Sequence, residues 1–205
     1  MTAGLLLSAV PPKGDPFVMI ATDSKGASLE GGPADEKAQK VFDAGNALLA
    51  VSGVATDAHR SRLVNILKSH KEQPIDKKMQ LVYDESLAVK KELGLNMTAA
   101  IMQFDENGNP QVAFCYVGTD EGDQQFNPHT FDRRVPEVNH AYFGEDKEGV
   151  TEFRKKLDEK LDKKTITPDH VRESAGWFIR RAAEAFPEAV NTRVQTRVKV
   201  FRPGM

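Results

Sequence analysis

A hairpin with one uninterrupted apolar strand constrains the fold of this chain more than any other stretch. Residues 41–43 and 47–52 favour β-structure, and residues 44–46 (Ala-Gly-Asn) between them suit a tight hairpin turn. Residues 48–51 (Leu-Leu-Ala-Val) contain no polar side chain, which predicts a strand covered on both faces. Gly53 ends this strand at a junction with a helix, where a backbone N–H can approach another group closely.

Length and charge exclude several classes of protein. A chain of 205 residues can bury a sizeable core, and we expect one domain over residues 1–205. The net charge of −2, without a basic cluster, gives no electrostatic basis for binding nucleic acid. No apolar run approaches the roughly 20 residues of a membrane span, and residues 5–7 are too few for a secretion signal. The single cysteine, Cys115, fits a reducing compartment, so we expect a cytoplasmic protein.

Two apolar stretches near the amino terminus, residues 2–10 and 17–22, flank a segment with three prolines and one glycine. Such a segment forms a turn, and an antiparallel hairpin centred on it pairs residues whose numbers sum to about 27. Thr2 is therefore expected opposite residue 23, 24 or 25, to within two residues. The turn alone predicts that the amino terminus lies beside Asp23.

Helical and extended patterns alternate in blocks along the rest of the chain. Apolar periodicity predicts helices over residues 55–70, 76–93, 149–164 and 168–186, and strands over residues 97–104, 111–117, 138–143 and 193–201. Residues 118–137 are polar and irregular, and we expect a loop with at most a short strand. Helix pairs separated by strands predict an α+β fold, a four-layer α/β/β/α sandwich with two antiparallel sheets between two helix layers.

Four short motifs follow one another in an order that bears on function. They are Ala-Thr-Asp-Ser-Lys at residues 21–25, Lys-Val at residues 40–41, Ser-Gly-Val-Ala-Thr-Asp at residues 52–57, and Phe-Asp-Glu-Asn-Gly at residues 104–108. In order and spacing they resemble the motifs of the β-type proteasome subunit and its bacterial relatives, which are N-terminal-nucleophile hydrolases. The resemblance spans nearly the whole chain.

The resemblance implies a hydrolase that uses an amino-terminal threonine. Thr2 would be both nucleophile and base once Met1 is removed, because its α-amine takes the proton of its own hydroxyl. Lys40 would lower the proton affinity of the threonine site, and Asp23 would hold that lysine in place. The N–H of Gly53 would donate to the oxyanion.

The resemblance also implies peptide or protein substrates and a homo-oligomeric ring, and it leaves an ATP-dependent unfoldase open as a partner. It implies no metal and no organic cofactor. The five histidines of the chain have no metal-ligand spacing. Cys115 lies inside an apolar strand and is expected to be a core residue rather than a nucleophile.

Two elements of the family pattern are missing. The family has Gly-Ser-Gly before its third helix, where residues 143–146 of this chain read Phe-Gly-Glu-Asp. It also has Asp-x-x-Ser-Gly after its fourth helix, where residues 186–192 offer only Glu188. One alternative is therefore a catalytically inactive scaffold or ring-forming protein on the same fold. Another is a hydrolase of small-molecule amides.

Each candidate site residue also has a structural interpretation. Thr2 is then the start of a strand, Asp23 and Lys40 are a structural ion pair, and Gly53 is a turn glycine. The state of the amino terminus separates the two interpretations, because an acylated α-amine is an amide and cannot act as a base.

Overall fold

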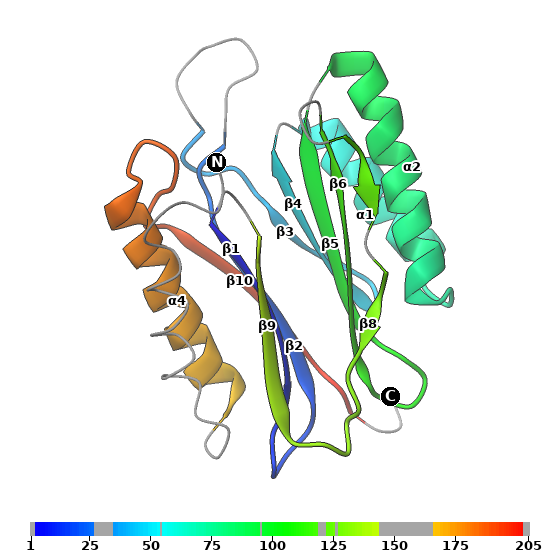
Figure 1. The fold of residues 1–205 in the computed structure, drawn as a ribbon, viewed down its shortest axis with the longest axis vertical. Coiled ribbons are helices and arrows are strands. Elements are labelled where there is room, and N and C mark those ends of the chain that lie inside the picture. Colours follow the sequence, from blue (N-terminus) through cyan, green and yellow to red (C-terminus); the bar gives the residue numbers. More distant parts are fainter. Residues whose placement is uncertain are drawn as a thin grey trace.

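Two antiparallel sheets lie face to face between helices in this computed structural model (Figure 1). The structure describes residues 3–26, 35–53, 55–94, 96–118, 122–125, 127–143 and 166–202. Helices α1 (Asp57–Ser69) and α2 (Ile75–Leu93) cover the six-stranded sheet, and α4 (Pro168–Ala185) covers the four-stranded sheet. These four layers confirm the predicted sandwich. The predicted helix over residues 149–164 lies outside the described residues.

The four-stranded sheet has the first strand of the chain in its interior. Its strands lie in the order β10, β2, β1, β9, with bounds Val194–Val200, Phe17–Asp23, Gly4–Val10 and Glu137–Phe143. Gly4 lies opposite Thr22, so the hairpin register falls within the margin predicted from the turn. All residues of β1 and β2 are buried, because α4 covers one face of this sheet and the other sheet covers the second face.

The six-stranded sheet contains the predicted hairpin. Its strands follow the order β3, β4, β5, β6, β7, and β8 also pairs with β6; the bounds are Val41–Ala44, Ala47–Gly53, Met97–Phe104, Pro110–Val117, Gln124–Gln125 and His129–Thr130. The two-residue strands β7 and β8 fall in the stretch expected to be a loop. Their side chains are polar and exposed, so no apolar alternation marks them in the sequence.

Strand β4 is covered on both faces, as its apolar run predicts. Leu49 and Val51 pack with residues of α1 and α2, whereas Leu48 and Ala50 pack in the layer between the two sheets. The turn before β4 has two residues, and the first of them, Gly45, has a φ of +77°. A glycine at this position matches the twist of the flanking strands and therefore fixes the register of the hairpin.

Three ends of the described helices are capped by residues next to them in the sequence. Thr56 Oγ1 accepts a hydrogen bond from the backbone N–H of His59 at the start of α1, and Thr167 Oγ1 accepts one from His170 at the start of α4. Gly94, in the left-handed conformation, ends α2. Among the helices that the structure describes, none is long and apolar enough to cross a membrane.

A fully buried lysine ties α2 to the six-stranded sheet. Lys78 Nζ donates to Asn46 Oδ1 (2.8 Å), to Lys71 O (2.8 Å) and to Gln103 Oε1 (2.7 Å). Burial lowers the pKa of Lys78 to about 8, against an opposing effect of the Glu72 carboxylate. Three acceptors from the hairpin turn, the α1–α2 connection and β5 thus meet at one ammonium group.

Candidate active site at the start of the first strand

The carboxylate of Asp23 joins three segments of the chain at the end of β2. Its Oδ1 accepts hydrogen bonds from Ala3 N (3.1 Å) and from Lys40 Nζ (3.0 Å), and its Oδ2 accepts one from Lys25 N (2.8 Å). Asp23 is completely buried and Lys40 is 3% exposed. The structure therefore brings two of the predicted site residues, Asp23 and Lys40, into direct contact beside the start of β1.

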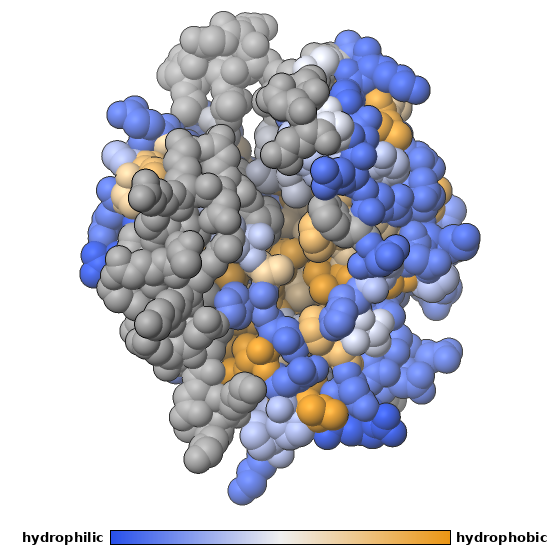
Figure 2. All heavy atoms as spheres, in the orientation of Figure 1, coloured by the Kyte–Doolittle hydropathy of each residue, from blue (hydrophilic) through white to orange (hydrophobic). Residues whose placement is uncertain are grey.

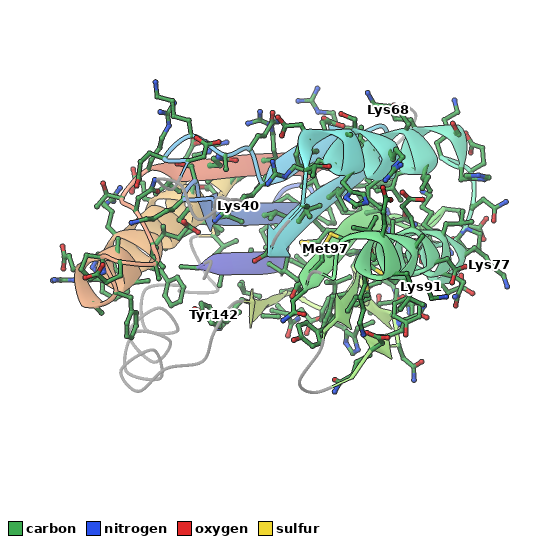
Figure 3. All side chains as sticks on the ribbon, turned by 90° about the horizontal axis from the view of Figure 1, so that it is seen from above. Lys40, Lys68, Lys77, Lys91, Met97 and Tyr142 are labelled. Carbon is green, nitrogen blue, oxygen red and sulfur yellow. The ribbon has the colours of Figure 1, made fainter. Side chains whose placement is uncertain are left out.

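The main chain of Lys40 is fixed by both sheets. Its N–H donates to Gln195 Oε1 on β10 (3.0 Å), and its carbonyl accepts from Val51 N on β4 (2.9 Å). Gln195 Nε2 in turn donates to Ala38 O (2.6 Å). Seen from above, Lys40 lies between α4 on one side and α1 and α2 on the other (Figure 3). The position of Lys40 is thus fixed through its backbone, independently of the contact between its side chain and Asp23.

Burial and the neighbouring charges act in opposite directions on Lys40. Burial lowers the pKa of its ammonium group, whereas the charge of Asp23 and the hydrogen bond to it raise that pKa, and Arg60 lowers it slightly further. The net direction is downward. A lysine in this setting provides a desolvated positive charge, which acts more strongly on a neighbouring group than an exposed lysine would.

Gly53 occupies a conformation and a space that only glycine fits. Its φ is +91°, and a Cβ at this position would lie 2.3 Å from Asn96 O on the neighbouring chain segment. Gly53 is the last residue of β4 and is exposed. It follows Val51, the partner of Lys40, by two residues, which is about 7 Å along a strand. The predicted oxyanion donor therefore lies at the same end of the sandwich as the ion pair.

An asparagine after α4 completes the surroundings of the ion pair. Asn191 Oδ1 accepts from Ser24 N (3.1 Å), and Asn191 Nδ2 donates to Glu36 Oε2 (2.8 Å). Ser24 Oγ donates to Glu36 O (2.8 Å). The family has Asp-x-x-Ser-Gly after its fourth helix, and the one acidic residue of this chain in that stretch, Glu188, is exposed. The sequence did not point to Asn191, because the Asp-x-x-Ser-Gly motif of the family has an acid and a serine, and an asparagine matches neither.

Thr22, next to Asp23, is completely buried, and its Oγ1 has no hydrogen-bond partner in the part of the chain that the structure describes. Thr2, the predicted nucleophile, lies outside the described residues. Its peptide bond joins it to the nitrogen of Ala3, which is the nitrogen that donates to Asp23. The covalent chain therefore leads from the described site directly to Thr2.

No metal-binding group is found in the described part of the chain, where no three or more His, Cys, Asp or Glu side chains are placed to hold an ion. Cys115 is completely buried, and burial raises the pKa of its thiol to about 12. The thiol is therefore protonated at physiological pH, and its position in the core agrees with the prediction.

The fold matches solved structures over almost its whole length. HslV from Trypanosoma brucei gives a TM-score of 0.54 at 14% identity, covering 96% of this chain and 99% of that chain. The Anbu complex from Pseudomonas aeruginosa, solved as a helical assembly, gives 0.56 at 14% identity, covering 97% and 81%. Anbu (ancestral beta-subunit) from Yersinia bercovieri gives 0.56 at 11% identity, covering 96% and 81%.

No protein-family model and no curated protein sequence matches the chain. The similarity is therefore one of fold. The chain has the fold of HslV and Anbu, which is the proteasome β-subunit-like fold of the N-terminal-nucleophile hydrolases.

Proposed function

We propose that this chain is a threonine-type peptide or amide hydrolase on the proteasome β-subunit-like fold, with Thr2 as its nucleophile after removal of Met1. The observation that carries the proposal is the contact of Ala3 N with Asp23 Oδ1 at 3.1 Å, because the same oxygen accepts from Lys40. Ala3, the residue that follows Thr2, is thus held by a buried carboxylate that also binds a buried lysine, which supports the proposal.

The proposed reaction needs no group beyond the chain and water. Thr2 Oγ1 attacks the carbonyl carbon of the substrate while the α-amine of Thr2, with an unperturbed pKa of about 7.7–8.0, takes the hydroxyl proton. The resulting ammonium protonates the leaving amine when the C–N bond breaks, which leaves an ester on Thr2. Water, deprotonated by the same amine, then hydrolyses the ester and restores the hydroxyl.

Lys40 and Asp23 support this chemistry electrostatically. The positive charge of Lys40 disfavours a second positive charge nearby and so keeps the α-amine of Thr2 in its neutral, proton-accepting form. Asp23 keeps Lys40 charged in its buried position, against the desolvation that lowers the pKa of the lysine. The N–H of Gly53 donates to the oxyanion, and removal of such a donor elsewhere costs about 3 kcal/mol in the transition state.

The first experiment is intact mass spectrometry of the purified protein, which reports whether Met1 is removed. If it is, Thr2→Ala should abolish turnover of fluorogenic peptides, whereas Thr130→Ala, at an exposed position of β8, should leave turnover unchanged. Quantitative retention of Met1, or equal turnover by wild type and Thr2→Ala, contradicts the proposed mechanism.

The second candidate function is a catalytically inactive scaffold on the same fold. It is favoured by the hydrogen bonds of Asp23, because both carboxylate oxygens already accept from Ala3, Lys25 and Lys40. A purely structural ion pair has such an arrangement. Under this alternative Met1 is retained, no peptide is cleaved, and Asp23→Asn changes stability alone.

Both candidate functions are proposed for a homo-oligomer. The support is that Anbu from Pseudomonas aeruginosa, which has the same fold, was solved as a helical assembly. A closed ring, a cytoplasmic location and an ATP-dependent unfoldase are further parts of the proposal. Light scattering coupled to size-exclusion chromatography tests the assembly, and turnover of a folded substrate with and without an unfoldase and ATP tests the partner.

A further inference from the structure

A cavity of about 160 Å³ lies between the two sheets, away from the candidate active site. Its apolar wall comes from β1, β5, β6 and β9 and from the residue after β8: Leu6, Met102, Val112, Ala141 and Phe131. Figure 2 shows apolar side chains gathered in a hollow on the face where β9, β8 and β6 lie foremost in Figure 1. The cavity is thus an edge of the inter-sheet core that side chains leave unfilled.

Two polar residues interrupt this apolar wall at one point. Ser8 on β1 and Asn139 on β9 are direct cross-strand partners, and both line the cavity. Their neighbours two residues away, Leu6 and Ala141, pack in the layer between the sheets, so Ser8 and Asn139 face the same layer. Ser8 is buried and Asn139 is half-buried at this place. A molecule in the cavity would therefore lie directly against their polar groups.

The amide of Asn139 includes a buried donor, its Nδ2, which finds no hydrogen-bond acceptor among the described residues. Ser8, directly opposite, is 2% exposed. An unsatisfied buried donor is unfavourable, and native proteins keep few of them without a reason. A ligand with one hydrogen-bond acceptor at this end of the cavity would satisfy it.

The size and charge of the cavity define the class of ligand. Cavities of about 150 Å³ engineered in another protein hold benzene. Among the described residues that line this cavity there is no Asp, Glu, Lys or Arg, and His140 is the titratable one. A charged ligand would therefore lose its hydration without gaining an opposite charge.

We propose that this cavity binds a small neutral molecule that joins an apolar body of about the size of a benzene ring to one carbonyl oxygen. The carbonyl accepts from Asn139 Nδ2, and the apolar body packs against Leu6, Met102 and Val112. The site is independent of the proposed hydrolase activity. Ser8 is five residues from Ala3 along β1, or about 17 Å at the rise of a strand.

Two isosteric probes test the proposal on the full chain. Acetophenone has a carbonyl, whereas α-methylstyrene has a CH₂ group in place of the oxygen. Titration of each probe, followed by NMR of backbone amides and side-chain methyl groups, should shift the signals of Leu6, Val112 and Ala141. Acetophenone should bind about two- to tenfold more tightly, as expected for one additional hydrogen bond.

Substitutions then separate the donor from the cavity. Asn139→Leu should remove the preference for acetophenone while binding of α-methylstyrene is kept or improved. Asn65→Leu, at an exposed position of α1, is the matched control and should change neither. Ala141→Leu, which fills the cavity, should abolish binding of both probes, and thermal unfolding of each variant confirms that it is folded.

Several outcomes overturn the proposal. One is the absence of localised shifts with either probe on the wild-type protein at millimolar concentration. Another is equal affinity for both probes in wild type, which would show that Asn139 does not take part. A crystal structure grown with acetophenone that shows only ordered water on Asn139 Nδ2 would identify the cavity as a hydration site.

Discussion

Asp23 and Ala3 hold each other by two hydrogen bonds. The backbone N–H of Asp23 donates to Ala3 O at 3.0 Å, and the carboxylate of Asp23 accepts from Ala3 N at 3.1 Å. The first pair continues the ladder between β1 and β2 by one step, and the second extends it through a side chain. Ala3, just before β1, is therefore fixed against the residue that also binds Lys40.

Loss of the Asp23–Lys40 pair should lower the free energy of unfolding much more than loss of an exposed ion pair. Asp23→Asn leaves a buried ammonium without its opposite charge, so we expect a loss of about 3–5 kcal/mol in the free energy of unfolding. Asp43→Asn, which breaks the exposed contact of Asp43 Oδ1 with Lys199 Nζ at 3.0 Å, should cost less than about 1 kcal/mol. Urea unfolding measures both.

A double variant shows whether the loss comes from the unpaired charge. Lys40→Met in the Asp23→Asn background should recover part of the stability, because it removes the orphaned ammonium. Equal losses for Asp23→Asn and Asp43→Asn would rule out an energetic difference between the buried and the exposed pair.

Gly53→Ala should reduce both stability and activity. The added methyl group meets Asn96 O, and φ of +91° is strained for any residue with a Cβ, so a loss of about 1–3 kcal/mol is expected. If the Gly53 N–H is the oxyanion donor, kcat should fall about 10²–10³-fold. The control is Gly122→Ala, which also has a positive φ, +75°, but open space for a Cβ. A variant that is destabilised but keeps full kcat would assign Gly53 a structural role only.

Asn191→Ala should lower activity because it changes the position of Ser24 and Asp23, not because it removes a contact with the substrate. It removes the acceptor of Ser24 N and the donor to Glu36, with an expected loss of about 1–3 kcal/mol in stability. Because Ser24 follows Asp23 directly, we also expect a lower kcat with little change in KM. Asn65→Ala on the exposed face of α1 provides the baseline. A change confined to KM would instead place Asn191 in contact with the substrate.

Lys78→Met should change the pH dependence of stability. The pKa of Lys78 in the folded chain, about 8, lies below the ordinary lysine value of 10.5, so between these pH values the unfolded chain binds more protons than the folded chain. Wild-type stability therefore rises relative to Lys78→Met as pH rises from about 8 to about 10.5. Urea unfolding at pH 7.5 and at pH 9.5 measures the difference.

The neighbouring Lys77 supplies the control for this pH effect, since it is exposed on α2. The stability difference between wild type and Lys77→Met should be the same at both pH values. If the Lys78→Met difference is also constant, the buried ammonium does not titrate in this range.

The elements with a strong local pattern were the ones that the sequence predicted well. The apolar run of residues 48–51 predicted a strand covered on both faces, and apolar periodicity predicted helices over residues 55–70, 76–93 and 168–186, which the structure contains as α1, α2 and α4. The turn of residues 11–16 predicted the register of the first hairpin. For residues 118–137 the sequence predicted a loop with at most a short strand, and it did not locate β7 and β8, because two exposed polar residues each carry no periodicity.

The candidate site was predictable where local geometry or a motif pointed to it. The hairpin register placed the amino terminus near Asp23, and the family resemblance implied that Asp23 holds Lys40, but the catalytic roles of both remain predictions. Asn191 and the cavity lined by Asn139 depend on segments far apart in the chain. No local pattern reports that an amide at residue 191 reaches Ser24 across 167 positions.

Since the backbone N–H of Lys40 donates to Gln195 on β10 and its carbonyl accepts from Val51 on β4, one residue links the two sheets of the sandwich. Any sliding of one layer past the other would have to stretch one of these two bonds and displace the ammonium group from Asp23. The position of the Lys40 ammonium group therefore depends on how the two sheets are packed, so a change in their packing would also change the charge beside Ala3.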